Sequence, residues 1–143
     1  MAAYKKVLVL LDLAAGSEQV ALAGRDLAAH SKAALVVLHV VEFVPLEPIG
    51  ESLMPSPQVE DDLVDLARTT LGKLMQRLEL ASAITRVEVG NTKMEILRVA
   101  EEERADLIVL GSRERHGLAI LVNFTEDTVL HGAHCDVLAV RLK

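Results

Sequence analysis

Near its start the chain reads Val7-Leu8-Val9-Leu10-Leu11-Asp12, five consecutive apolar residues and then a carboxylate. A short apolar run that stops at a polar residue is typical of a strand buried on both faces of a sheet. Similar runs recur along the chain, and one of them alternates apolar with polar residues, as a half-exposed edge strand does. The predicted strands cover residues 7–11, 33–41, 84–89, 107–110 and 136–141.

Segments with a helical spacing of apolar residues separate these strands. Ser17 is placed to cap a helix over residues 18–30, and Ser56 followed by Pro57 marks the start of a second helix that reaches residue 80. This second helix carries one apolar stripe, as helices packed on a core do. The stripe consists of Val59, Leu63, Leu66, Ala67, Leu71, Leu74 and Leu78.

The remaining helices have their own start and stop signals. Residues 92–95 read as a capping box, from Thr92 to Glu95, that opens a helix reaching residue 103. Asn123 or Thr125 caps a last helix that ends at Gly132. Strands that alternate with helices imply right-handed crossovers. The sequence therefore predicts an α/β fold, with one doubly wound parallel sheet of five strands and helices on both faces.

The composition limits the classes of function. The chain has 143 residues, which suits a single domain over residues 1–143, and 51% of them are hydrophobic but only 2% aromatic, so the core is aliphatic. The net charge is −6, and the one short basic cluster runs from Arg113 to His116. Nucleic acid is therefore not expected as a partner, because its binding needs a basic face.

The cysteine count and the apolar runs point to a compartment. Cys135 is the single cysteine, so no internal disulfide forms, and we interpret it as a core thiol in a reducing environment. Residues 1–6 lack the apolar run of a signal peptide. No uninterrupted apolar stretch approaches the roughly 20 residues of a membrane helix. We expect a cytoplasmic protein that does not bind membranes.

Four segments resemble the universal stress protein family, in the order expected of that family: KVLVLLD (6–12), VLHVVE (37–42), ADLIVLGS (105–112) and AHCDVLAV (133–140). The resemblance covers essentially the whole chain. It implies the strand order 3-2-1-4-5, with the switch point between the first and fourth strands, so that Asp12 and Gly111 lie at one crevice. Ligands of open parallel sheets bind at such a point.

Many members of this family bind ATP there, through a loop of Gly, two residues, Gly, nine residues, Gly, and Ser or Thr. By resemblance, Gly111 matches the first glycine and Thr125 the final hydroxyl, and Asp12 and Val40 occupy the positions that contact ribose and adenine. Ser112 and Arg113 follow Gly111 at the same rim. The resemblance therefore makes these six residues the cofactor-binding candidates for ATP or AMP.

Two residues depart from the loop pattern. Glu114 stands at the second glycine position and Phe124 at the third. A carboxylate about 5 Å from a phosphate charge costs roughly 3 kcal/mol at an effective dielectric near 20, and a phenylalanine fills space that the loop needs empty. The chain thus resembles the universal stress protein A branch, whose members lack the glycine-rich loop and do not bind ATP, and no cofactor is expected. The alternative is an adenine-nucleotide module that uses an atypical loop from Gly111 to Thr125.

Other candidate sites have simpler explanations. Asp12 either contacts a ligand or caps the turn that follows it, and His39 is interpreted as a hydrogen-bonded core histidine. Arg113, Arg115 and His116 either hold an anion at the rim or form a solvated loop. No residues show metal-ligand spacing. The sequence has no Gly-x-Ser-x-Gly elbow, no Walker loop, and no paired nucleophile and base. A phospho-receiver would need an acidic pair after the first strand, where this chain has Asp12 alone, so we predict no enzyme and no catalytic residues.

The last predicted strand suggests a role in assembly. If residues 136–141 form a sheet edge, their unpaired backbone groups invite another strand. The family resembled here commonly dimerises by pairing such edges antiparallel. We therefore expect a non-catalytic stress-response protein that forms a homodimer on the segment from Asp136 to Arg141 and acts through contacts with other proteins.

Overall fold

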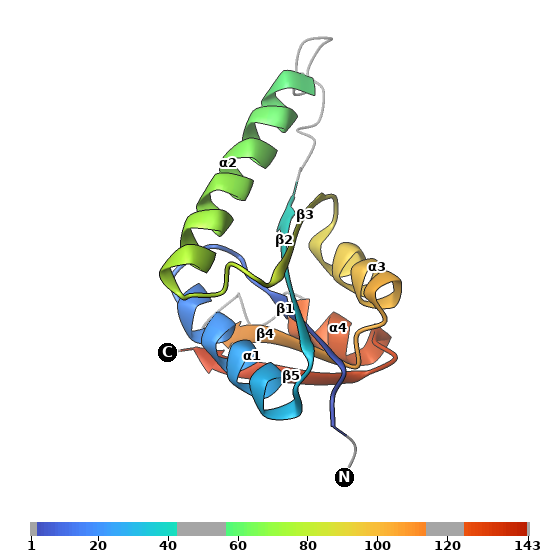
Figure 1. Ribbon diagram of the computed structural model, residues 1–143. Helices are drawn as coiled ribbons and strands as arrows, with labels where there is room; N and C mark the ends of the chain where they lie inside the picture. The colour runs from blue at the N-terminus through green and yellow to red at the C-terminus, as the bar shows by residue number, and fades with distance from the viewer. Residues whose placement is uncertain (1–2, 43–56, 114–124, 143) are drawn as a thin grey trace.

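The computed structural model describes residues 3–42, 57–113 and 125–142 (Figure 1). Its helices and strands alternate along the chain, as the sequence predicts. They are β1 (Lys6–Leu10), α1 (Ser17–Ser31), β2 (Ala34–Val41), α2 (Pro57–Arg77), β3 (Ile84–Val89), α3 (Thr92–Glu103), β4 (Leu107–Arg113), α4 (Thr125–Gly132) and β5 (Asp136–Leu142).

The strands form one sheet in the order β3-β2-β1-β4-β5, and each neighbouring pair is parallel. The predicted α/β class and the strand order implied by the family resemblance are both confirmed. The winding reverses at β1, which pairs with β2 on one side and with β4 on the other. The carboxyl ends of β1 and β4 therefore lie next to each other.

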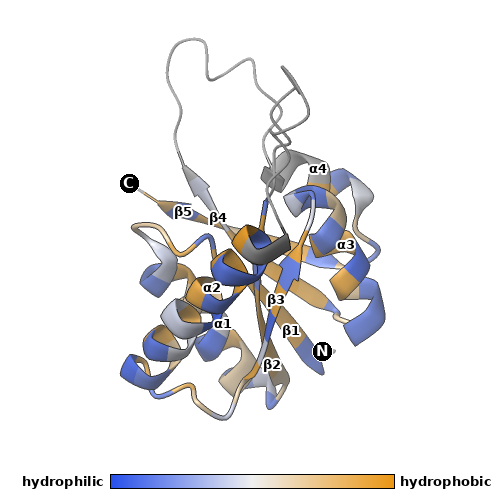
Figure 2. Ribbon diagram, turned by 90° about the horizontal axis from the view of Figure 1, so that it is seen from above, coloured by the Kyte–Doolittle hydropathy of each residue, from blue (hydrophilic) through white to orange (hydrophobic). Residues whose placement is uncertain are grey.

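Helices cover both faces of the sheet (Figures 1 and 2). The side chains of Val7 and Val9 pack under α1 and α2, whereas Leu8 packs under α3 and α4. All three are fully buried. Since successive side chains of a strand point to opposite faces, a strand covered on both faces must be apolar at every position. This explains the unbroken run at residues 7–11.

Two helix starts differ from the sequence prediction. The residue that precedes α1 as its N-cap is Gly16, and Ser17 is the first helical residue, because its hydroxyl donates to Asp12 instead of accepting from the helix. Asn91, not Thr92, caps α3, and its Oδ1 accepts a hydrogen bond from the backbone N–H of Met94 at 3.1 Å. Ser56, the predicted cap of α2, lies outside the described residues, as does most of the proline-rich loop.

The predicted apolar stripe of α2 divides into two parts. Towards the C-terminal end, Ala67, Leu71 and Leu78, which directly follows the helix, are buried, and the two leucines belong to the core cluster on that face of the sheet. At the N-terminal end α2 extends beyond the strands (Figure 1), and there Val59, Leu63 and Leu66 are exposed. The predicted stripe is therefore buried only in its C-terminal part, because helical periodicity does not show where the sheet beneath a helix ends.

Candidate functional site

In open parallel sheets, ligands bind at the carboxyl edge of the sheet. Asp12 follows β1 there, and its Oδ1 accepts hydrogen bonds from the backbone N–H of Ala14 at 2.9 Å and from the hydroxyl of Ser17 at 3.0 Å. Leu13, which lies between Asp12 and Ala14, adopts a positive φ of 60°, a conformation that costs an L-residue about 1–2 kcal/mol. Asp12 thus caps the turn that follows β1, which is one of the two roles that the sequence suggested for it. Within the described residues its Oδ2 has no hydrogen-bond donor.

Val40 and His39 lie at the end of β2. Val40 is only 7% exposed and belongs to the core cluster under α3, so its side chain is committed to packing. His39 is half-buried, and its Nδ1 lies 2.7 Å from the carbonyl oxygen of Leu11. Because a carbonyl only accepts, Nδ1 carries the proton in this contact. The interpretation of His39 as a hydrogen-bonded core histidine is confirmed.

Gly111 lies in β4, beside the end of β1. A Cβ at this position would come within 2.7 Å of Cδ1 of Leu142 and 3.1 Å of Cγ2 of Val20. The glycine therefore has a packing role that does not depend on a phosphate: it lets the end of β5 and α1 close over β4.

Ser112 and Arg113 continue β4, paired with Arg141 and Leu142 of β5. The fourth strand, predicted to end at residue 110, is therefore longer than expected, because β5 extends far enough to hold these two residues in the sheet. Thr125 is the first residue of α4, and nothing is described of its side chain or of that of Arg113. Glu114, Arg115, His116 and Phe124 lie outside the described residues.

A second carboxylate at the same edge has a structural partner. Glu42, just after β2, accepts a hydrogen bond at Oε2 from the hydroxyl of Thr92 at 3.2 Å. Its Oε1 lies 3.5 Å from the backbone nitrogen of Thr92. A negative charge at the N-terminus of a helix is stabilised by the helix dipole. Glu42 therefore links the end of β2 to the first residue of α3.

Sequence reasoning missed an ion-pair network between β3 and α3. Arg86 is bound by Glu88, Glu102 and Glu103, and Arg98 by Glu88, Glu95 and Glu102. These hydrogen bonds raise the pKa of both arginines, against the opposing effect of burial. The hydrogen bonds from Arg86, then Arg98, lower the pKa of Glu102.

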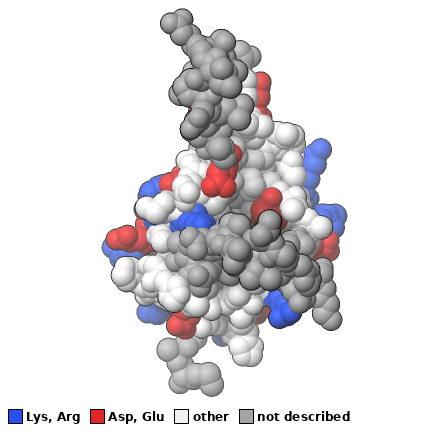
Figure 3. Space-filling model, turned by 180° about the vertical axis from the view of Figure 1, so that it is seen from behind, with Lys and Arg blue, Asp and Glu red and all other residues white. Residues whose placement is uncertain are grey.

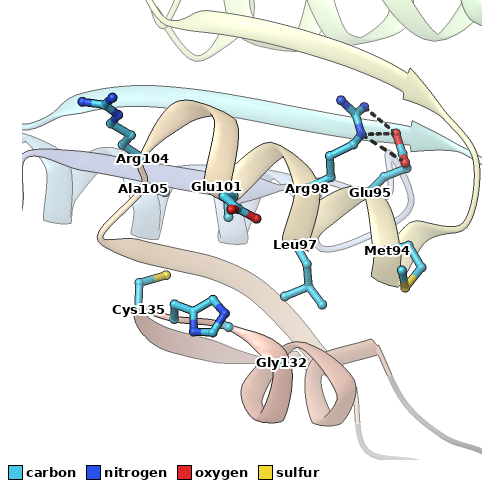
Figure 4. Close-up of a pocket in the computed structure, with 12 residues that line it drawn as sticks. Met94, Glu95, Leu97, Arg98, Glu101, Arg104, Ala105, Gly132 and Cys135 are labelled. Atoms are coloured by element: carbon cyan, nitrogen blue, oxygen red, sulfur yellow. Dashed lines mark hydrogen bonds and ion pairs between the residues drawn. The ribbon is translucent and has the colours of Figure 1, made fainter.

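A groove of about 690 Å³ lies between α3 and the connection from α4 to β5 (Figure 4). Its lining combines the apolar side chains of Leu97 and Ala133 with Glu101, His134 and Cys135. The half-buried environment of Cys135, followed by the charges of Asp136 and Asp106, raises the pKa of its thiol. The raised pKa favours the protonated thiol over the more reactive thiolate.

Several other chemistries find no support in the described part of the chain. Residues 3–42, 57–113 and 125–142 contain no group of three or more His, Cys, Asp or Glu side chains that could hold a metal ion. None of their helices is both long and apolar enough to cross a bilayer. On the face in Figure 3, the described Lys and Arg side chains alternate with Asp and Glu and form no continuous basic patch.

The fold and its carboxyl edge define a doubly wound α/β protein with its switch point between β1 and β4. The sequence model of the universal stress protein family matches residues 3–141. Universal stress protein A homolog 2 of Coxiella burnetii is 37% identical over 141 residues, which cover 98% of this chain and 97% of that protein. The chain belongs to the universal stress protein family.

Solved structures share the fold. Universal stress protein UspA from Lactobacillus plantarum aligns with a TM-score of 0.73 at 24% sequence identity, over 99% of this chain and 100% of that chain. A universal stress protein in complex with cAMP aligns with a TM-score of 0.74 at 24% identity, over 97% of this chain and 98% of that one. These similarities establish the architecture.

Proposed function

We propose that this protein is a non-catalytic stress-response protein that acts as a homodimer through contacts with other proteins and does not bind ATP. The observation that carries the proposal is the edge position of β5. Among the described strands β5 pairs with β4 alone, so no described strand lies on its other side. Leu138 in the middle of the strand is 38% exposed. Such an edge favours pairing with another strand.

The two edges of the sheet differ in how they are protected. β3 carries Arg86 and Glu88, both held in ion pairs, and charged side chains discourage strand pairing. β5 has the sequence DVLAVRL, with neither proline nor lysine. We therefore place the dimer contact on β5, from Asp136 to Arg141, and not on β3.

Three described groups that could act as nucleophile or base have other tasks. The hydroxyl of Ser17 donates to Asp12, the Nδ1 of His39 donates to a backbone carbonyl, and Cys135 has a raised thiol pKa. The lack of ATP binding rests on Glu114 and Phe124, which replace two glycines of the family's phosphate loop. Residues 1–143 then form a single domain, placed in the cytoplasm because its one cysteine suits a reducing compartment.

A second candidate function is the binding of an adenine nucleotide, ATP or AMP, through an atypical loop from Gly111 to Thr125. Two observations favour it. Asp12 follows β1 and Gly111 lies in β4, and these two strands are neighbours at the switch point. Oδ2 of Asp12 accepts no hydrogen bond from the described residues. A protein of similar fold has been solved in complex with cAMP. Under this alternative Asp12, Val40, Gly111, Ser112, Arg113 and Thr125 form the site.

The homodimer is tested by light scattering on the wild-type chain and on two variants of Leu138. Leu138→Pro removes a backbone N–H from the edge, and Leu138→Arg brings like charges of the two copies together. Both variants are expected to shift the protein from dimer to monomer. Leu130→Arg on α4, where the leucine is 58% exposed, is the matched control and is expected to stay dimeric. A wild-type monomer, or a dimer that both Leu138 variants leave intact, would rule out pairing on β5.

A further inference from the structure

The groove between α3 and the connection from α4 to β5 has the size of a small-molecule site. Its volume of about 690 Å³ falls in the range of about 300–1,000 Å³ that ligand pockets have. One wall is the side of α3 from Met94 to Arg104, and the other is the segment from Gly132 to Cys135 (Figure 4). All of the lining residues belong to the described part of the chain. The groove reaches the start of β5, at the edge of the sheet opposite the crevice between β1 and β4.

The floor of the groove is apolar and made of small or aliphatic side chains. Leu97, Ala133 and Cys135 are half-buried and pack on the core cluster under α3. Gly132 lets α3 and the end of α4 come close, because a Cβ on it would lie 2.8 Å from Cδ1 of Leu97. An unbranched alkyl chain on this floor would remove apolar surface from water, which favours binding.

The charged side chains that line the groove are not equally available to a ligand. Arg98 is held by three carboxylates, one of them that of Glu95. The side chains of Arg98 and Arg104 both point away from Gly132 (Figure 4). The carboxylate of Glu101 lines the groove and takes part in no hydrogen bond or ion pair within the described residues. Glu101 is therefore the charged group that a ligand in the groove can pair with.

The surroundings of the groove favour a cation over an anion. α4 ends at Gly132, and the C-terminal end of a helix carries a partial negative charge. Burial, followed by the charges of Asp136 and Asp106, raises the pKa of the Cys135 thiol. Both carboxylates accept hydrogen bonds from neutral donors, the hydroxyl of Tyr4 and two backbone N–H groups, so their negative charges persist. The field at this end of the groove thus opposes a second negative charge and attracts a positive one.

We propose that this groove is a binding site for a free linear aliphatic amine, whose alkyl chain lies along Leu97 and Ala133 and whose ammonium group donates to the carboxylate of Glu101. Glu101 follows Leu97 by four residues, about 6 Å along α3, so a short alkyl chain reaches from the apolar floor to the carboxylate. His134 lines the same end of the groove and is exposed, so a ring nitrogen can accept a second hydrogen bond from the ammonium group. The site does not depend on the dimer or on the nucleotide crevice.

A titration of the isotope-labelled full chain with hexylamine, followed by NMR, tests the proposal. The backbone amides of Leu97, Glu101, Ala133 and Cys135 are expected to shift and to reach saturation. Three related compounds separate the contributions to binding. Methylamine lacks the alkyl chain, hexanol lacks the charge, and hexanoate carries the opposite charge. Each is expected to bind more weakly than hexylamine does, and hexanoate the most weakly.

Two variants of Glu101 test the ion pair. Glu101→Gln keeps the shape of the side chain and removes its charge, so we expect hexylamine to bind about two- to fivefold more weakly, the range for an exposed ion pair. Glu101→Lys places a like charge at the ammonium group and is expected to abolish binding. Glu60→Gln, at an exposed glutamate of α2, is the matched control and is expected to bind as the wild type does. Because Glu101 is exposed, its substitution leaves the core intact, which the spectra of the unliganded variants check.

Three results would overturn the proposal. The first is that hexylamine produces no saturable shifts at the residues that line the groove. The second is that methylamine, hexanol or hexanoate binds there as tightly as hexylamine. The third is that both Glu101 variants bind hexylamine as the wild type does. A chain that does not dimerise through β5, or one that binds ATP, is still expected to give the predicted titration, because no residue of the groove belongs to either of those sites.

Discussion

The hydroxyl of Ser17 donates a hydrogen bond to Oδ1 of Asp12 across 3.0 Å, and the same oxygen accepts from the backbone N–H of Ala14. The carboxylate that ends the first strand therefore organises the turn into α1. This turn includes Leu13 and Gly16, both at positive φ. A structural task for Asp12 exists whether or not a ligand binds at this edge.

Asp12→Ala is expected to lower the free energy of unfolding by about 1–2 kcal/mol, because two hydrogen bonds to the carboxylate are lost. Asp12→Asn keeps an acceptor oxygen and is expected to retain most of the stability. Urea unfolding of the two variants measures both effects. Unchanged stability in Asp12→Ala would show that the turn does not need the carboxylate.

Gly24 lies where α1 crosses β1. A Cβ there would lie 2.2 Å from Cγ2 of Val9, a fully buried residue of the central strand. Gly24→Ala is therefore expected to destabilise the protein by about 1–3 kcal/mol through overpacking, despite the gain in helix propensity of about 1 kcal/mol. Gly72→Ala in α2, where nothing lies within 4 Å, is the matched control. Thermal unfolding compares the two, and a stabilised Gly24→Ala variant would contradict the close crossing.

The ion-pair network between β3 and α3 predicts a dependence of stability on pH. Arg86 and Arg98 lower the pKa of Glu102 from its usual value of 4.5. Because the pKa is lower in the folded state, the stabilisation is present above pH 4.5 and is lost as the pH falls through the folded-state pKa. Glu102→Gln is thus expected to be less stable than the wild type at pH 7 and equal to it in strong acid. Unfolding in urea at several pH values checks this, and a stability difference independent of pH would contradict it.

The thiol of Cys135 is expected to react slowly. Burial, Asp136 and Asp106 raise its pKa above the usual value of 9.0, so little thiolate exists at neutral pH. Alkylation by iodoacetamide at pH 8 should therefore be slower in the folded chain than in the chain unfolded by urea. Faster alkylation of the folded protein would mark Cys135 as an activated thiol and not as a packing residue.

The sheet was predictable because its central strands are covered on both faces. Val7, Leu8 and Val9 must all be apolar in that environment, and the resulting run is visible without any knowledge of neighbours. The strand order is a different matter, since no local pattern states which strands pair. It followed from the resemblance of four segments to the universal stress protein family.

The parts that sequence reasoning missed depend on contacts between distant residues. Glu102 in the acidic end of α3 binds Arg86 of β3, and this pairing needs the crossover geometry that places the strand beside the helix. Ser17 has the chemistry of an N-cap, yet its hydroxyl is used as a donor to Asp12, which only the turn brings within reach. The exposure of Leu66 depends on how far α2 extends beyond the sheet.

The central claim, a family member that acts without ATP, is tested most directly by calorimetric titration with ATP and AMP. The purified protein is first unfolded in a parallel sample to show that it carries no nucleotide. The account predicts no detectable binding heat, because Glu114 and Phe124 replace two glycines of the phosphate loop. Binding in the low micromolar range, lost in Asp12→Ala and in Thr125→Ala, would contradict it and establish the crevice between β1 and β4 as a nucleotide site.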